Sequence, residues 1–163
     1  MLRRGVVPVI AVLLVRDVDA QCTIARQRVQ VGITSTVYIA NALVGARIAI
    51  RDSLPQSPFG IRTGRTPSAD FFAGTGTALS PGLPFLAAQA VTSVALTGSA
   101  STARTGSRLL GVFGVGYSVG QLAEPVARGA IAHPLSKPSR TAIVVGNVVL
   151  PAAMAALAFR NCR

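Results

Sequence analysis

The chain alternates between long apolar runs and short polar stretches that carry basic residues and prolines. A helix needs about 20 apolar residues to cross a hydrocarbon layer of about 30 Å. Four runs approach or exceed this length: residues 29–50, 82–102, 109–127 and 141–159. The pattern predicts an all-α fold, an integral membrane protein with a four-span antiparallel transmembrane helical bundle. This bundle would form a single domain over residues 29–160.

A shorter apolar segment precedes the first run. Residues 1–20 begin with two arginines, continue as an apolar core from Gly5 to Val15, and end in Ala20. This order is typical of a secretory signal peptide cut after a small residue. The core would reach only about 16 Å as a helix, which is too short to span a bilayer. Residues 1–28 are therefore interpreted as a short N-terminal apolar leader and tail, with an uncleaved interfacial segment as the alternative.

The overall composition favours a membrane protein over a nucleic-acid-binding one. Half of the residues are hydrophobic and 13% are charged, whereas soluble domains carry about 25% charged residues. The net charge of +11 comes from basic residues that flank apolar runs, and aromatic residues make up only 5% of the chain. A continuous basic stripe with stacking aromatics is therefore missing. We expect the lipid bilayer as the partner, no nucleic acid, and a location in the plasma membrane.

The third run is rich in glycine. A glycine inside a soluble helix costs about 1 kcal/mol relative to alanine, whereas in a membrane small residues let a second helix approach closely. We predict a helix-packing face formed by Gly111, Gly116 and Gly120. The facing helix would belong to the same bundle, to a second copy of the chain in a homo-oligomer, or to a membrane-protein partner.

Each predicted span also contains one amide side chain at a similar depth, roughly 10–15 Å from the same end of the bundle. These residues are Asn41, Gln89, Gln121 and Asn147. Glu124 lies nearer that end, with Arg128 four residues later and Arg47 on a parallel span as candidate partners. Two interpretations remain open. The cluster forms hydrogen bonds between helices and a structural ion pair, or it forms a polar pocket with a titrating carboxylate.

The sequence contains no recognisable catalytic or cofactor-binding motif. Patterns such as GxSxG, Walker A and HExxH are missing, and one histidine with two cysteines does not make a metal cluster. No catalytic residue, metal or cofactor is therefore expected. Cys22 and Cys162 should lie at the end of the bundle opposite Glu124. We expect free thiols there, with a disulfide as the alternative if that side is oxidising.

Two functional hypotheses follow from these patterns. The first is a non-enzymatic protein that works through helix packing or as an accessory of a membrane complex, because of its glycine face. The second is a small transporter or proton-linked carrier that uses Glu124, Arg47 and the amide layer. Basic residues are distributed too evenly between the two ends for the positive-inside rule to assign an orientation.

Overall fold

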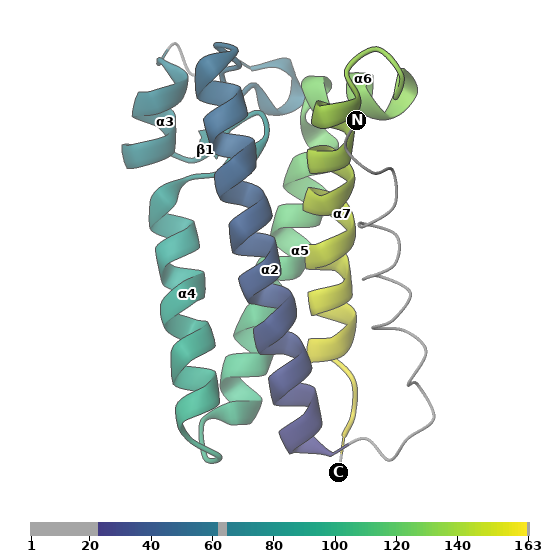
Figure 1. Ribbon diagram of the computed structural model, residues 1–163. Helices are drawn as coiled ribbons and strands as arrows, with labels where there is room; N and C mark the ends of the chain where they lie inside the picture. The colour runs from purple at the N-terminus through teal and green to yellow at the C-terminus, as the bar shows by residue number, and fades with distance from the viewer. Residues whose placement is uncertain (1–22, 62–64, 163) are drawn as a thin grey trace.

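The computed structural model of the protein describes residues 23–61 and 65–162, and in these residues the chain is mostly helical, with six α-helices. Four of them are long and run alternately in opposite directions, forming an antiparallel bundle (Figure 1). They are α2 (Ile24–Arg51), α4 (Leu83–Gly98), α5 (Ala103–Ala123) and α7 (Pro138–Ala158). The predicted helical bundle is therefore confirmed. The leader and its proposed cut after Ala20 lie outside the described residues.

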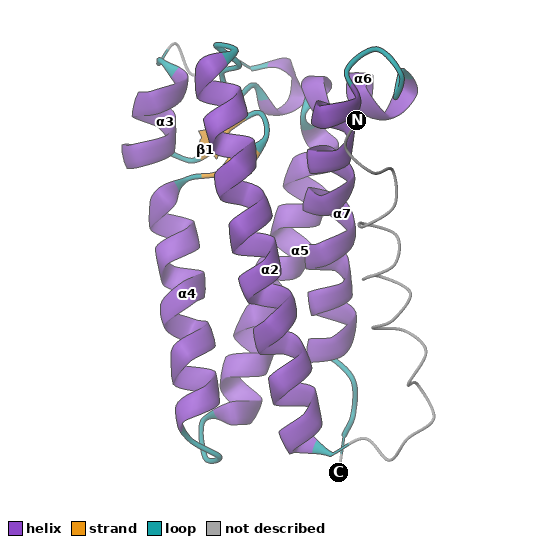
Figure 2. Cartoon of the chain, in the orientation of Figure 1, coloured by secondary structure: helices purple, strands orange, loops and turns teal. Residues whose placement is uncertain are grey.

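The long helices form a closed ring, in which α2 and α5 each contact both α4 and α7. Short elements cover one end of this ring, where α2 and α5 end and α4 and α7 begin (Figure 2). We call it the capped end. The short elements are a 3-10 turn (Pro58–Gly60), α3 (Pro67–Ala73), β1 (Gly76–Thr77), β2 (Ser80–Pro81) and α6 (Pro125–Ala132).

Helix boundaries follow local sequence signals. The side chain of Thr23 accepts a hydrogen bond from the Arg26 N–H and so caps α2, because the first N–H groups of a helix need an outside acceptor. Residues 24–28, predicted to be a tail, are thus helical. At the end of α5, Pro125 holds Glu124 in an extended conformation with φ −74° and ψ 125°, as expected before proline. The third predicted span therefore stops at Ala123 rather than at residue 127.

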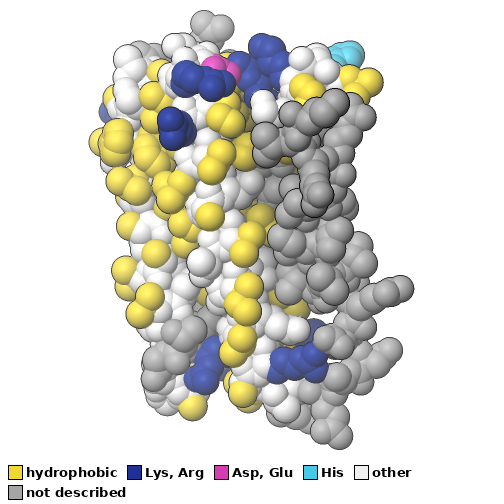
Figure 3. All heavy atoms as spheres, viewed as in Figure 1, with side chains coloured by type: hydrophobic (Ala, Val, Ile, Leu, Met, Phe, Trp, Pro, Cys, Tyr) yellow, Lys and Arg dark blue, Asp and Glu magenta, His cyan; other side chains and the backbone are white. Residues whose placement is uncertain are grey.

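The interior of the bundle contains polar side chains among its apolar ones, and the lateral surface carries many large apolar side chains. Fully or nearly fully buried positions include Thr34, Ser35, Gln89, Ser107 and Asn147. Large aliphatic side chains are instead exposed on every long helix, for example Ile33, Val91, Val119 and Val149. Figure 3 shows hydrophobic side chains over the middle of one face and basic ones near both ends. A water-soluble bundle usually has polar residues on the outer face of each helix and few buried polar groups, so this bundle departs from that arrangement.

A small hairpin, residues 76–81, inserts among the helices at the capped end. Its two strands pair Gly76 with Pro81 and Thr77 with Ser80, and the residues from Thr77 to Ser80 are all buried. A glycine in α2 makes room for it, because a Cβ added at Gly45 would lie 2.3 Å from the Leu79 carbonyl oxygen. The sequence did not predict this hairpin, since its turn contains none of the residues that usually mark one.

Two of the four predicted spans meet the length and hydropathy that a bilayer requires. Helices α2 and α7 are long and apolar enough to cross a membrane, and α4 contributes a shorter apolar stretch, Leu83–Ala95. Helix α5 has the same number of residues as α7, 21, but its glycines and first-turn arginine lower its hydropathy.

Candidate functional site

Three of the four amides predicted to share a layer are joined by hydrogen bonds. Asn147 is fully buried, and its Oδ1 accepts a hydrogen bond of 2.8 Å from Asn41 Nδ2. The Nδ2 of Asn147 lies 3.4 Å from Oε1 of Gln121. These contacts connect α2, α7 and α5 at one level of the bundle.

The same amides bind the backbone of the inserted hairpin. Asn147 Nδ2 donates to the Leu79 carbonyl oxygen at 2.6 Å, and Gln121 Nε2 donates to that of Ala78 at 3.0 Å. A buried carbonyl without a partner is costly. The amides therefore act as a clamp that makes burial of the hairpin favourable.

Gln89 lies apart from this network, so the expected layer of four amides is wrong in one member. Its Nε2 donates to Ser35 Oγ at 2.8 Å, while its Oε1 is buried without a hydrogen-bond partner. Ser35 precedes Asn41 by six residues on α2, or about 9 Å along the helix axis. The hairpin occupies the level of the bundle next to the capped end. Helix α4 therefore begins further from the capped end than predicted, and Gln89 lies further from that end as well.

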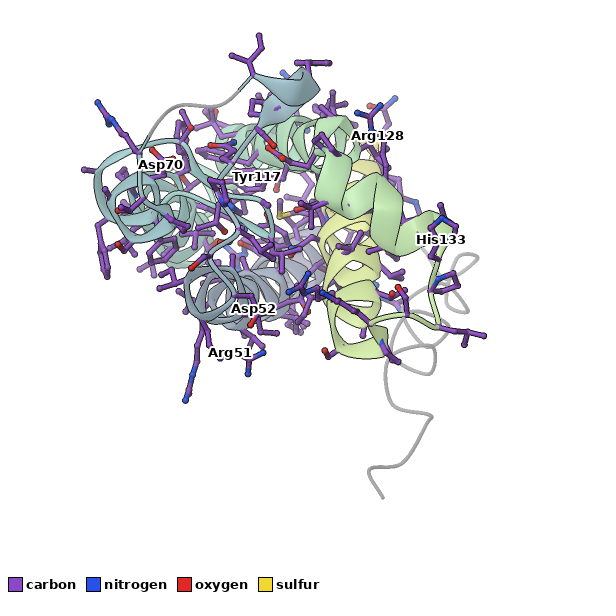
Figure 4. All side chains as sticks on the ribbon, turned by 90° about the horizontal axis from the view of Figure 1, so that it is seen from above. Arg51, Asp52, Asp70, Tyr117, Arg128 and His133 are labelled. Atoms are coloured by element: carbon purple, nitrogen blue, oxygen red, sulfur yellow. The ribbon has the colours of Figure 1, made fainter. Side chains whose placement is uncertain are left out.

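Glu124 does not form the predicted ion pair. Its side chain is only 3% exposed, and its two carboxylate oxygens each lie 3.2 Å from the Ser57 backbone N–H. Within the described chain, neither Arg47 nor Arg128 comes within ion-pair distance of it. Arg47 lies on the exposed side of α2, and Arg128 on α6 points away from the bundle (Figure 4).

The surroundings of Glu124 act on its pKa in both directions. Burial raises the pKa of this carboxyl above its ordinary value, and this effect outweighs the Ser57 hydrogen bond and the charge of Arg128, which lower it. Removing a carboxylate from water disfavours its charged form. Glu124 is therefore easier to protonate than an exposed glutamate.

An ion pair that the sequence did not predict links α2 to α7 at the capped end. Arg140 Nη2 lies 2.5 Å from Asp52 Oδ2, and Arg51 Nε lies 2.9 Å from Asp52 Oδ1. Hydrogen bonds from Arg51 and then Arg140 lower the pKa of Asp52 to about 2. The signal was available, because Asp52 follows the first predicted span and Arg140 precedes the fourth.

A second contact that was not predicted closes the opposite end. Gln27 Nε2 on α2 donates to the carbonyl oxygens of Leu157, at 2.7 Å, and Arg160, at 2.9 Å. These belong to the C-terminal end of α7, where carbonyls lack helical partners. Nearby, Cys162 is disulfide-bonded, so the expectation of a free thiol there is wrong. Cys22, the other cysteine of the chain, lies outside the described residues.

The glycines of α5 divide between two faces. A Cβ added at Gly111 would lie 2.9 Å from the Ala158 Cβ, and one at Gly114 would lie 2.4 Å from the Pro151 carbonyl oxygen. These two glycines pack against α7. By contrast, a Cβ added at Gly116 or Gly120 would meet nothing within 4 Å. The prediction that Gly116 and Gly120 pack against a helix of this bundle is therefore wrong.

Gly116 and Gly120 instead line a cavity of about 380 Å³ between α4, α5 and the capped end. One end is polar and includes Gln56, Thr75, Gln121 and Glu124, and the other is aromatic, formed by Tyr38, Phe85, Phe113 and Tyr117. The α5 residues recur at intervals of three or four, so they share one face of the helix. The spacing of these α5 residues could be read from the sequence, but the sequence did not indicate that this face of α5 borders an open space.

Within residues 23–61 and 65–162, no group of three or more histidine, cysteine, aspartate or glutamate residues could hold a metal ion. We take the cavity beside Gly116 and Gly120 as the candidate site, because it brings the buried carboxylate of Glu124 together with aromatic rings. No family model matches the chain, and no curated protein or solved structure matches it either.

Proposed function

We propose that this chain is a non-enzymatic, four-span integral membrane protein that binds a small molecule in the cavity between α4 and α5. The observation that carries the proposal is the cavity itself, which joins an aromatic end to a polar end containing Glu124. Ligand sites are usually concave and mainly apolar, with a few polar groups that fix orientation. An accessory subunit that delivers or senses such a ligand fits this description.

The exposed aliphatic side chains of the bundle and its buried polar side chains support a membrane location for all four long helices. In lipid, apolar side chains face outward without cost, while buried amides and hydroxyls form hydrogen bonds between helices. Helices of 21 residues reach about 31 Å, close to the hydrocarbon thickness. Helix α4 is shorter, and the loop and hairpin at its capped end would fill the remaining depth while keeping their carbonyls paired.

The two hypotheses drawn from the sequence fare differently. Association through a glycine face loses its basis inside the bundle, because Gly111 and Gly114 already contact α7 and Gly116 faces the cavity. The carrier hypothesis can no longer use the amide layer as a polar path, since Gln121 and Asn147 bind carbonyl oxygens of the hairpin. It remains a second candidate because Glu124, a buried carboxylate, lines the cavity. A proton-coupled flux assay in proteoliposomes with Glu124→Gln would test it.

The disulfide at Cys162 supports an orientation, which the basic residues left open. Disulfides persist in oxidising compartments, so we place the end of the bundle that carries Cys162 outside the cell and the capped end in the cytoplasm. A cysteine introduced at the exposed Ser136, in the α6–α7 turn, should resist a membrane-impermeant maleimide in intact cells and react after lysis. Labelling in intact cells would show that the capped end lies outside the cell, which is the opposite orientation.

Membrane integration is tested by alkaline carbonate extraction, in which the protein should stay in the pellet and dissolve only with detergent. Release by carbonate as a soluble monomer would contradict the four-span architecture. This experiment does not depend on the ligand.

Ligand binding is tested with N-phenylnaphthylamine, a neutral dye whose fluorescence rises in apolar sites, and protein in phosphatidylcholine nanodiscs. Saturable binding is expected for the wild type. Gly116→Leu should abolish it by filling the cavity, whereas Ala152→Leu, at an exposed position of α7, should leave it unchanged. Unsaturable fluorescence equal to that of empty nanodiscs, or equal binding by Gly116→Leu, would contradict the proposed site.

A further inference from the structure

The charge of the cavity lining contrasts with that of the whole chain. The protein has 16 lysines and arginines against five acids, yet among residues 23–61 and 65–162 the lining includes no lysine or arginine and a single carboxylate, that of Glu124. In a chain with so large an excess of positive charge, a lining with only a negative group selects against anions. The polar end of the cavity therefore favours a ligand with positive charge.

Glu124 has unused capacity for such a ligand. A carboxylate can accept about four hydrogen bonds, whereas within the described part of the chain Glu124 accepts one, from the Ser57 N–H, which is shared between its two oxygens. Arg128 is close enough to influence it electrostatically but not to form an ion pair. A buried carboxylate of this kind is stabilised when a cation approaches.

The other end of the cavity is suited to an apolar or cationic group next to aromatic rings. Tyr38 stacks on Tyr117 with a centroid distance of 5.1 Å, and the ring centroids of Phe113 and Tyr117 are 5.7 Å apart. The Tyr117 hydroxyl donates to the Phe85 carbonyl oxygen at 3.2 Å, which holds this ring in place. Aromatic faces attract organic cations as well as apolar groups.

The shape of the cavity sets the form of the ligand. Phe113 and Glu124 are 11 residues apart, or about 16 Å along the axis of α5. Gly116 and Gly120 leave space between them. At the aromatic end, Phe85 and Val112 are 45% and 62% exposed, so the cavity reaches the lateral surface between α4 and α5. A molecule dissolved in the membrane could enter there.

We infer that the cavity is a site for a monovalent organic cation with an apolar body, whose positive group lies beside Glu124 and whose body contacts the ring of Tyr117. This inference rests on the proposed ligand-binding function and adds the charge and shape of the ligand. Glu124 supplies charge selection, while the aromatic side chains supply affinity that does not depend on charge.

The test compares two probes that differ only in charge, benzyltrimethylammonium and its neutral carbon isostere neopentylbenzene. Both are titrated calorimetrically into protein in phosphatidylcholine nanodiscs, which carry no net charge. Glu124→Gln should weaken binding of the cation by about tenfold or more, because a charge-assisted contact in a buried site is lost. The same variant should leave affinity for neopentylbenzene unchanged. Glu124→Asp keeps the charge and should retain cation binding.

N-phenylnaphthylamine separates failure of this inference from failure of the proposed function. If Glu124→Gln binds the dye and the cation as the wild type does, the inference is overturned and the cavity function stands. If the wild type does not bind the dye, the proposed function itself is overturned. If Glu124→Gln loses dye binding through misfolding, Glu124→Asp decides. If Glu124→Asp binds the dye and retains affinity for the cation, the inference is supported. If Glu124→Asp binds the dye but loses affinity for the cation, the inference is overturned.

Discussion

The side-chain nitrogen of Asn147 donates a hydrogen bond of 2.6 Å to the carbonyl oxygen of Leu79. This contact joins the middle of α7 to the turn of a hairpin 68 residues earlier in the chain. It explains how a hairpin of two very short strands can be buried among helices. The clamp fixes the hairpin, which forms part of the cavity wall through Thr77, Ser80 and Pro81.

Asn147→Leu should lower the free energy of unfolding by about 2–3 kcal/mol, because it leaves the Leu79 carbonyl and the Asn41 amide buried without this partner. Gln89→Leu is the matched control. Its Oε1 has no partner, and Ser35 would keep its hydrogen bond with Ser93. The control should cost about 1 kcal/mol or less. Equilibrium unfolding in mild detergent measures both, and equal losses would argue against the clamp.

Substitution by alanine should change the stability of the protein in opposite directions at two glycines of α5. Gly114→Ala places a methyl group 2.4 Å from the Pro151 carbonyl oxygen, and such overpacking costs about 1–3 kcal/mol. Gly116→Ala meets nothing within 4 Å and should be neutral or stabilising by up to about 1 kcal/mol, because alanine favours the helix. Thermal unfolding in detergent distinguishes them. A larger loss for Gly116→Ala would place the helix contact on the other face of α5.

Acid should remove the contribution of the Asp52 ion pairs to stability. The pKa of Asp52 is lowered to about 2 in the folded protein, against about 3.9 for an aspartate in an unfolded chain. A lowered pKa in the folded state stabilises at pH values above the unfolded pKa, and this contribution disappears as the pH falls towards the folded pKa. The difference in melting temperature between the wild type and Asp52→Asn should therefore be constant above about pH 5 and shrink towards about pH 2.

The comparison with Asp52→Asn cancels the effects of other acids, which remain in both proteins. Glu124, whose raised pKa acts in the opposite direction, is one of them. A difference in melting temperature that stays constant from pH 5 to pH 2 would show that the contacts with Arg51 and Arg140 do not lower the pKa of Asp52.

Affinity for benzyltrimethylammonium should depend on pH through Glu124. Only the ionised carboxylate attracts the cation, so affinity should decrease as the pH falls through the pKa of Glu124. Burial raises this pKa above the ordinary value of 4.5, while the Ser57 N–H and Arg128 on α6 oppose the shift. The midpoint should therefore lie above pH 4.5.

Two observations check this pH dependence. The weak binding by Glu124→Gln should not vary with pH, because the carboxyl group is gone. A wild-type midpoint at or below 4.5 would mean that the carboxylate is more stable in the cavity than in water, which contradicts its described burial.

The number and direction of the four long helices could be predicted from the sequence alone, whereas the short helices α3 and α6 were not predicted. Apolar runs separated by arginines and prolines specify where helices begin and end, because charge and proline act locally. The break before Pro125 is of this kind, since proline restricts the residue that precedes it. The depth of Asn41, Gln121 and Asn147 also followed from counting residues, because the helical rise is constant.

Only the tertiary structure decided which face of each helix meets a neighbour. On α5, Gly114 and Gly116 point about 160° apart. One face contacts α7 and the other borders the cavity, and the choice depends on where the other helices lie. The inserted hairpin has the same origin. Its burial depends on Gly45 in α2 and on amides from two helices, α5 and α7. Hydrogen bonds of backbone carbonyls to distant side chains leave no periodic pattern in a sequence.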